Sequence, residues 1–131
     1  MALVPSALVS AGPPLSCDLL GLQVTEHGPH ARVVTVTGEI DALTAPKLGA
    51  LMTAQLAATS MLVIDLARVR FLGSAGLSAL FAANEFAIRE NRYLWLVFPH
   101  RGIVNRALEV TGLSEQFNIA ETVVAALINS L

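Results

Sequence analysis

The chain contains few of the residues on which catalytic and metal-binding sites are built. Its 131 residues include one cysteine, Cys17, which excludes an internal disulfide and leaves no zinc site of the Cys-rich type. The three histidines, His27, His30 and His100, are each adjacent to a glycine or a proline. No carboxylates or cysteines are spaced around them as ligands or as a catalytic pair. We therefore interpret them as exposed loop residues, and we expect no catalytic residue, no metal and no cofactor.

Charge and long apolar runs are also scarce. Charged residues make up 14% of the chain and the formal net charge is −2. Without a basic excess the surface cannot neutralise nucleic-acid phosphates, so we expect no direct nucleic-acid binding. No segment is continuously apolar over the roughly 18 residues that a membrane span requires, so no membrane insertion is expected. Apolar residues nevertheless make up 54% of the chain, which indicates a compact globular domain.

The first 17 residues are apolar but lack the features of a secretion signal. No Lys or Arg precedes Arg32, and three prolines interrupt the apolar stretch. We predict a mobile or loosely docked tail at residues 1–17, one domain at residues 18–131 and a cytoplasmic location. The tail either covers a sheet edge or mediates self-association into a homodimer, and the sequence leaves both alternatives open.

The periodicity of apolar residues predicts five strands. Two alternating stretches on either side of a Gly-Pro turn predict a hairpin over residues 20–37. The continuous apolar run at residues 61–66 is typical of a central strand covered on both faces. Further strands are predicted at residues 93–98 and, as a brief edge strand, at residues 117–119.

Helical spacing of apolar residues predicts helices between and after these strands. The first begins with Thr44 as N-cap and Pro46 in its first turn, and a later, short one is ended by Gly112. The apolar residues predicted to form the buried faces of the second and the last helix are Leu77, Leu80, Phe81 and Ile88, and Val124, Leu127, Ile128 and Leu131. The alternation predicts an α/β fold with one mixed, mostly parallel sheet flanked by about four helices.

Ser74 is the hydroxyl with the most informative surroundings. It lies in the stretch Phe71–Leu77, which is neither a nucleophile elbow, since Leu72 stands where a glycine is required, nor a phosphate-binding loop, since there is no lysine. One interpretation is an N-cap of the second helix. The other uses the same position, because an exposed serine at a helix start tolerates a phosphate there. The added charge would repel a partner docked over it, which would make a binding switch.

Three further residues have a structural and a functional interpretation. Asp41 follows Gly38-Glu39-Ile40 and is either a turn carboxylate that helps to cap the next helix or a contact to a partner. Asp65 lies within an apolar strand, where a charge needs a structural partner. Trp95 alternates with leucines, and we expect it in the core.

Three motifs in fixed order carry a resemblance to a known family. They are Val36-Thr37-Gly38-Glu39-Ile40-Asp41 with Thr44-Ala45 and Leu48; Leu62-Val63-Ile64-Asp65-Leu66 through Val69 and Phe71-Leu72 to Ser74-Ala75-Gly76-Leu77; and Val104, Ala107-Leu108 and Thr111-Gly112-Leu113. With these motifs, the chain resembles the STAS domain of bacterial anti-sigma factor antagonists over about residues 19–130. The middle motif, with its spacing from the first, is the most specific of the three.

The resemblance implies a protein-binding switch and not an enzyme. The implied partner is an anti-sigma factor with a histidine-kinase-like ATPase fold, which phosphorylates the antagonist on a serine, and a serine phosphatase reverses the modification. Ser74 matches the phospho-acceptor. The implied partner-binding residues are Asp41, Thr44, Leu72, Gly73, Ser74, Ala75, Gly76 and Leu77.

One position departs from the best-studied pattern of the family. An Asp usually precedes the phospho-acceptor, and this chain has Gly73 there. Glycine either gives a relaxed turn before the helix or indicates altered selectivity for the partner or kinase. A second function is also compatible with the composition, namely a STAS adaptor that regulates the ATPase of a membrane transporter. A nucleotide-handling enzyme has no supporting motif.

Overall fold

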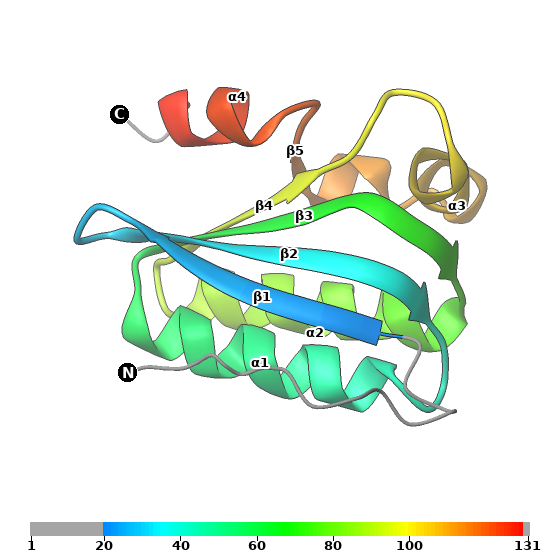
Figure 1. Cartoon of the computed structure of the whole chain (residues 1–131), viewed down its shortest axis with the longest axis horizontal. Helices are drawn as coiled ribbons and strands as arrows, with labels where there is room; N and C mark the ends of the chain where they lie inside the picture. Colours follow the sequence, from blue (N-terminus) through cyan, green and yellow to red (C-terminus); the bar gives the residue numbers. More distant parts are fainter. Residues whose placement is uncertain (1–19, 130–131) are drawn as a thin grey trace.

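The computed structural model describes residues 20–129. The predicted tail at residues 1–17, Cys17 and Leu131 lie outside this range. The described residues form a five-stranded mixed sheet in which the strands lie side by side in chain order (Figure 1). β1 pairs with β2 antiparallel, and all other neighbours are parallel. The strands are β1 (Leu20–His27), β2 (Ala31–Ile40), β3 (Met61–Leu72), β4 (Tyr93–Val97) and β5 (Asn118–Ala120). The predicted hairpin, mixed sheet and short edge strand are confirmed.

Helices cover both faces of the sheet. Along one face, α1 (Ala45–Ala58) and α2 (Ser74–Arg89) lie side by side, and α4 (Val123–Ile128) lies on the opposite face (Figure 1). α3 (Ile103–Thr111), next to the far end of β3, and a 3₁₀ turn, η1 (Ser114–Gln116), connect β4 to β5. The predicted α/β class with about four helices is confirmed. None of the helices within residues 20–129 has the length and apolar character that a membrane crossing demands.

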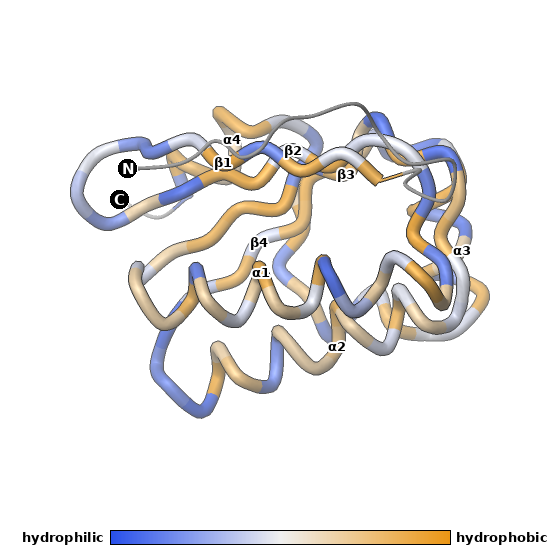
Figure 2. Tube along the Cα trace, turned by 60° about the horizontal axis from the view of Figure 1, so that its bottom comes forward, coloured by the Kyte–Doolittle hydropathy of each residue, from blue (hydrophilic) through white to orange (hydrophobic). Residues whose placement is uncertain are grey.

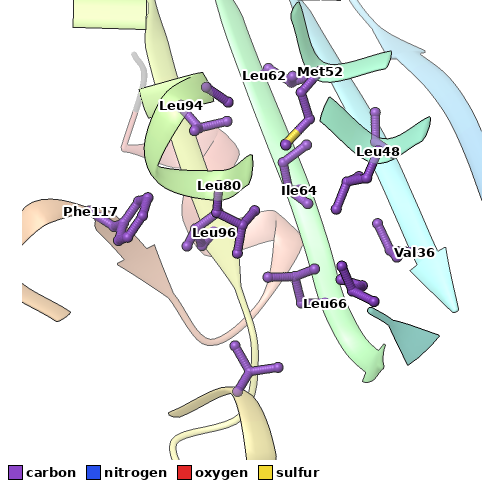
Figure 3. Packing of buried hydrophobic residues seen from close by; sticks show 14 of the residues in the cluster. Val36, Leu48, Met52, Leu62, Ile64, Leu66, Leu80, Leu94, Leu96 and Phe117 are labelled. Atoms are coloured by element: carbon purple, nitrogen blue, oxygen red, sulfur yellow. The ribbon is translucent and has the colours of Figure 1, made fainter. Parts of the chain in front are cut away.

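The central strand β3 is apolar in sequence because helices cover it on both sides. Leu62, Ile64 and Leu66 pack against α1 and α2, where Leu48, Met52 and Leu80 meet them (Figure 3). Met61 and Val63 face the other way and form a second cluster with Val33, Val97, Ala120 and Ala126 beneath α4. Trp95 is half-buried against this second cluster. Figure 2 shows the hydrophobic central strands and the hydrophilic hairpin turn, where His27 and His30 are exposed as predicted.

The predicted buried face of α2 is partly wrong. Leu77 and Leu80 are buried, but Phe81 is 37% exposed and Ile88 is 62% exposed. The face that packs inward continues instead through Ala83, Asn84 and Ala87. α1 lies beside α2, and a Cβ built at Gly49 would be in ordinary contact, 3.9 Å from the Cβ of Ala79.

The predicted buried face of α4 is also partly wrong: Leu127 packs on the sheet as predicted, but Val124 and Ile128 do not. Val124 and Ile128 are 65% and 60% exposed, whereas Ala126 is fully buried. The helix carries two apolar stripes with the same helical spacing, and the stripe of Val123, Ala126 and Leu127 packs on the sheet. Periodicity alone does not distinguish two such stripes.

Candidate functional site

The connection between β2 and α1 is a tight turn held by Asp41 and Thr44. The Asp41 carboxylate accepts hydrogen bonds from the N–H groups of Leu43 (2.9 Å) and Thr44 (3.0 Å). The buried Thr44 hydroxyl accepts from the Asp41 N–H (2.8 Å) and donates to the Glu39 carbonyl (2.8 Å). Thr44 stands at the predicted N-cap position, but its hydroxyl bonds this turn and does not cap the helix. The interpretation of Asp41 as a turn carboxylate is therefore confirmed.

These hydrogen bonds favour the ionised form of Asp41. The Thr44 N–H, followed by the Leu43 N–H and the Thr44 hydroxyl, holds the pKa of the Asp41 carboxyl below its ordinary value of 3.8, although partial desolvation acts in the opposite direction. Asp41 therefore presents a fixed negative charge at the end of β2. Asp65, by contrast, has a local partner, since its carboxylate accepts from the Ala67 N–H at 3.0 Å.

The end of β3 lies beside this turn. The Gly73 N–H donates to the Ile40 carbonyl at 3.0 Å, which joins the start of α2 to the end of β2. Gly76 allows close packing at the same place, because a Cβ there would lie 2.6 Å from both Ile40 Cγ2 and Leu72 Cδ1. The Asp41–Thr44 turn and Ser74, which are at least 30 residues apart in sequence, therefore lie together at the carboxyl ends of neighbouring parallel strands (Figure 1).

Ser74 is exposed as the first residue of α2. Gly73 occupies the N-cap position, and no side chain caps this helix, so the interpretation of Ser74 as N-cap is wrong. The first helical hydrogen bond of this end runs from the Leu77 N–H to the Gly73 carbonyl at 3.1 Å. The N–H groups of the first turn, including that of Ser74 itself, are thus left without helical acceptors beside the serine hydroxyl.

The predicted partner-binding residues divide by exposure. Ser74 is exposed, and Asp41, Leu72, Gly73 and Ala75 are half-buried. Thr44, Gly76 and Leu77 are buried. The buried three shape the surface from beneath, and the others lie where a partner can reach them.

Two exposed apolar side chains beside Ser74 were missed by sequence reasoning. Leu43 is 74% exposed in the Asp41–Thr44 turn, and Phe71 is 49% exposed at the end of β3. The Phe71 ring lies over Gly73, with Cε2 3.1 Å from the position of a Cβ there. The only sequence signal was Leu43, an apolar residue within a turn. Phe71 follows a register shift opposite Gly38 and Glu39, and this bulge rotates it out of the alternation that buries Val69.

Two further observations bear on chemistry at this surface. Within residues 20–129, no three histidines, cysteines or carboxylates lie together as metal ligands would. Asp41 and Ser74 belong to separate elements, and the hydrogen bonds of Asp41 run to its own turn. The arrangement fits recognition of another surface, with a fixed charge, a hydroxyl and two apolar side chains.

Comparison with known proteins agrees with this architecture and motif order. The STAS domain family matches residues 22–126. The chain belongs to the STAS domain family. This STAS domain is 32% identical to the anti-sigma-F factor antagonist RsfB of Mycobacterium tuberculosis over 111 residues, which cover 84% of this chain and 88% of that protein.

Solved structures show the same fold. An anti-sigma factor antagonist from Mycobacterium paratuberculosis superposes with a TM-score of 0.75 and 36% identity, over 84% of this chain and 92% of that chain. The Bacillus cell fate determinant SpoIIAA in its phosphorylated form gives a TM-score of 0.66 over 85% of this chain and 100% of that chain. At 16% identity, SpoIIAA supports the fold alone.

Proposed function

We propose that this STAS domain is an anti-sigma factor antagonist, which binds an anti-sigma factor and thereby releases a sigma factor. Its relatives from Mycobacterium carry that name. The observation that carries the proposal is the exposed Ser74 beside the fixed Asp41 turn, with Leu43 and Phe71 exposed on the same surface. The role is one of binding and not of catalysis, and it would be exercised in the cytoplasm, where transcription takes place.

The proposal includes phosphorylation of Ser74 as the off-switch. The hydroxyl is exposed at a helix start, where first-turn N–H groups without helical acceptors favour an anion. A phosphate adds about −1.5 to −2 charges there. Asp41 already contributes one negative charge at the joined end of β2. The phosphate and Asp41 together would repel an acidic partner surface, and an apolar partner surface would have to desolvate both of them. The fold itself can accept the phosphate, so phosphorylation would weaken binding of the partner without unfolding the domain.

The proposed partner is an anti-sigma factor of the histidine-kinase-like ATPase fold, which acts as the serine kinase. The proposed contact comprises the exposed and half-buried members of the motif, Asp41, Leu72, Gly73, Ser74 and Ala75, together with Leu43 and Phe71. A serine phosphatase would restore binding.

Gly73 bears on the selectivity of this switch. Its φ of −91° and ψ of −178° are open to any residue, so the backbone does not require a glycine there. The Phe71 ring instead lies over the position that a side chain would occupy. This arrangement supports the alternative of altered partner or kinase selectivity over that of a relaxed turn.

Gly73→Asp tests the selectivity. Phe71 is half-exposed and can rotate away, so we expect the variant to fold, with a loss of at most about 1 kcal/mol in unfolding free energy. We expect its rate of phosphorylation by the cognate kinase to differ at least several-fold from that of the wild type, measured with purified kinase and ATP. Identical rates would show that residue 73 has no part in selectivity.

The binding role is tested by affinity capture from extracts of the source bacterium. The baits are the full chain, Ser74→Ala, Ser74→Asp and Thr53→Asp, the last adding the same charge at an exposed site on α1. We expect an anti-sigma factor on every bait except Ser74→Asp, with unchanged circular dichroism for all four. Capture of a transporter ATPase in its place would support the adaptor function and contradict the proposal.

A further inference from the structure

A cavity lined by both polar and apolar side chains lies at the end of the sheet opposite Ser74. It measures about 340 Å³ and is lined by the end of α2, the turn after it, the start of β4, η1 and β5. The residues that line it are Asn84, Ile88, Asn91, Arg92, Tyr93, Leu94, Gln116 and Asn118. Nothing in the proposed binding role uses this cavity.

The turn after α2 fixes Arg92 at the cavity wall. Asn91 has a φ of +57°, the left-handed conformation that ends many helices. The Arg92 N–H donates to the Ala87 carbonyl (2.7 Å) and the Asn91 N–H to the Ile88 carbonyl (3.2 Å), which together form a Schellman motif. The Arg92 backbone is thereby fixed, and its side chain is oriented by a bond from Nη1 to the Thr59 carbonyl at 2.7 Å.

Arg92 is a half-buried cation without a carboxylate partner. Within residues 20–129 an ion pair joins Arg32 and Glu26, and no carboxylate of that range forms one with Arg92. The Arg92 Nε is buried and has no acceptor. Nε itself is closed off from the cavity, but Arg92 as a whole is half-buried and lines it. An oxyanion that enters the cavity would pair with the accessible part of this guanidinium.

Two asparagines supply the complementary acceptors. Asn84, which is only 5% exposed, donates from Nδ2 to the Gln116 carbonyl at 2.8 Å. Asn118 donates from Nδ2 to the Leu94 carbonyl at 3.2 Å. In both side chains the amide nitrogen donates a hydrogen bond to the protein, and the amide oxygen accepts none from the described residues. Both oxygens are therefore available as acceptors. Ile88 and Tyr93, each 62% exposed, add an apolar rim.

We propose that this cavity binds a small carboxylate that also carries an N–H donor beside an apolar group. The carboxylate pairs with Arg92, the donor meets the oxygens of Asn84 and Asn118, and the apolar group lies against Ile88 and Tyr93. A free apolar amino acid and the C-terminal residue of a peptide share this chemistry.

NMR titration of the full chain with three probes tests the proposal. L-leucine represents the free amino acid, N-acetyl-L-leucine represents a peptide C-terminus, and N-acetyl-L-leucinamide lacks the carboxylate. We expect the Arg92 Nε–H and the Asn84 and Asn118 side-chain amides to shift with at least one carboxylate probe, at an affinity at least about tenfold above that of the amide probe. The probe that binds more tightly identifies the source of the ligand. Unshifted signals with both carboxylates, or equal binding of the amide, would overturn the proposal.

A matched pair of variants at the rim gives a second test. Ile88 is exposed, so both Ile88→Glu and Ile88→Gln are expected to fold. The added carboxylate of Ile88→Glu should repel the ligand and weaken binding about threefold or more relative to Ile88→Gln at low salt. Equal affinities would contradict a carboxylate in the cavity. Since Ser74 lies at the other end of α2, failure of this site leaves the proposed function untouched.

Discussion

At the scale of single residues, Gly76 is the most restrictive position of the surface. A methyl group there would lie 2.6 Å from side-chain atoms of both Ile40 and Leu72. We therefore expect Gly76→Ala to lower the unfolding free energy by about 1–3 kcal/mol, because α2 must move away from the end of β2. Urea denaturation of the purified variant measures the change.

Gly49→Ala is the matched control for that substitution. Gly49 also lies within a helix, but a Cβ there would be in ordinary contact, 3.9 Å from Ala79. We expect Gly49→Ala to leave the stability unchanged or raise it by up to about 1 kcal/mol, since alanine favours the helix. Equal losses of unfolding free energy for both variants would show that helix composition, and not the contact with Ile40 and Leu72, determines the stability of Gly76→Ala.

Asp41 gives the residue-scale prediction for pH. Its pKa is lowered in the folded state, first by the Thr44 N–H. As the pH falls, the unfolded chain therefore takes up a proton on Asp41 before the folded chain does, and stability declines. The contribution is complete above the ordinary pKa of 3.8 and is lost as the pH falls through the lower folded-state value. Carboxyl ¹³C titration should give a midpoint below 3.8, and a midpoint at or above this value would refute the turn geometry.

Sequence reasoning reached Asp41 and Ser74, but not the apolar residues beside them. The motifs pointed to both polar residues, and the structure places them on one surface. Leu43 lies in a turn, where strand alternation does not apply. Phe71 was missed because alternation predicts which face a residue occupies only where no bulge interrupts the strand. The register shift opposite Gly38 and Glu39 breaks that alternation, and its position is set by pairing with β2 and not by β3 alone.

At the scale of elements, the turn between β2 and α1 depends on one buried hydroxyl. Thr44→Ala removes the partner of both the Asp41 N–H and the Glu39 carbonyl. We expect a loss of about 1–3 kcal/mol in unfolding free energy, because both groups are left without that bond. Chemical denaturation measures it.

Thr44→Ser separates the hydroxyl from the methyl group. Serine keeps the hydroxyl and removes one buried methyl, so we expect a loss of about 0.8 kcal/mol, smaller than that for alanine. Losses of the same size for Ser and Ala would mean that packing, and not hydrogen bonding, fixes the turn.

For the helices, the sequence predicts that they exist but not fully which of their faces are buried. The existence of all four follows from apolar spacing, and Pro46 and Gly112 mark the start of α1 and the end of α3. The buried faces of α2 and α4 followed only in part. In α2 the inward face includes Asn84, which bonds the Gln116 carbonyl, and not Ile88; in α4 two stripes of equal spacing compete for the sheet. Such choices depend on neighbours distant in sequence, which periodicity does not contain.

At the scale of the whole molecule, the order of the strands in the sheet brings Ser74 and the Asp41 turn onto one surface. β2 and β3 are parallel neighbours, so their carboxyl ends meet, and α1 and α2 begin from that edge on the same face (Figure 1). The α/β class and the mixed, mostly parallel sheet were predictable from the alternation of elements, whereas the order of the strands in the sheet was not predicted. The family resemblance implied a shared contact surface of Asp41, Thr44 and the start of the second helix. In the structure the Gly73 N–H donates to the Ile40 carbonyl at 3.0 Å and joins these two elements.

Charge at Ser74 is proposed to control binding of an anti-sigma factor. Isothermal titration calorimetry measures this directly, with the purified anti-sigma factor and the chain in its unphosphorylated form and phosphorylated on Ser74. We expect phosphorylation to weaken binding at least about tenfold while the circular dichroism spectrum stays the same. Equal affinities for two equally folded forms would contradict it.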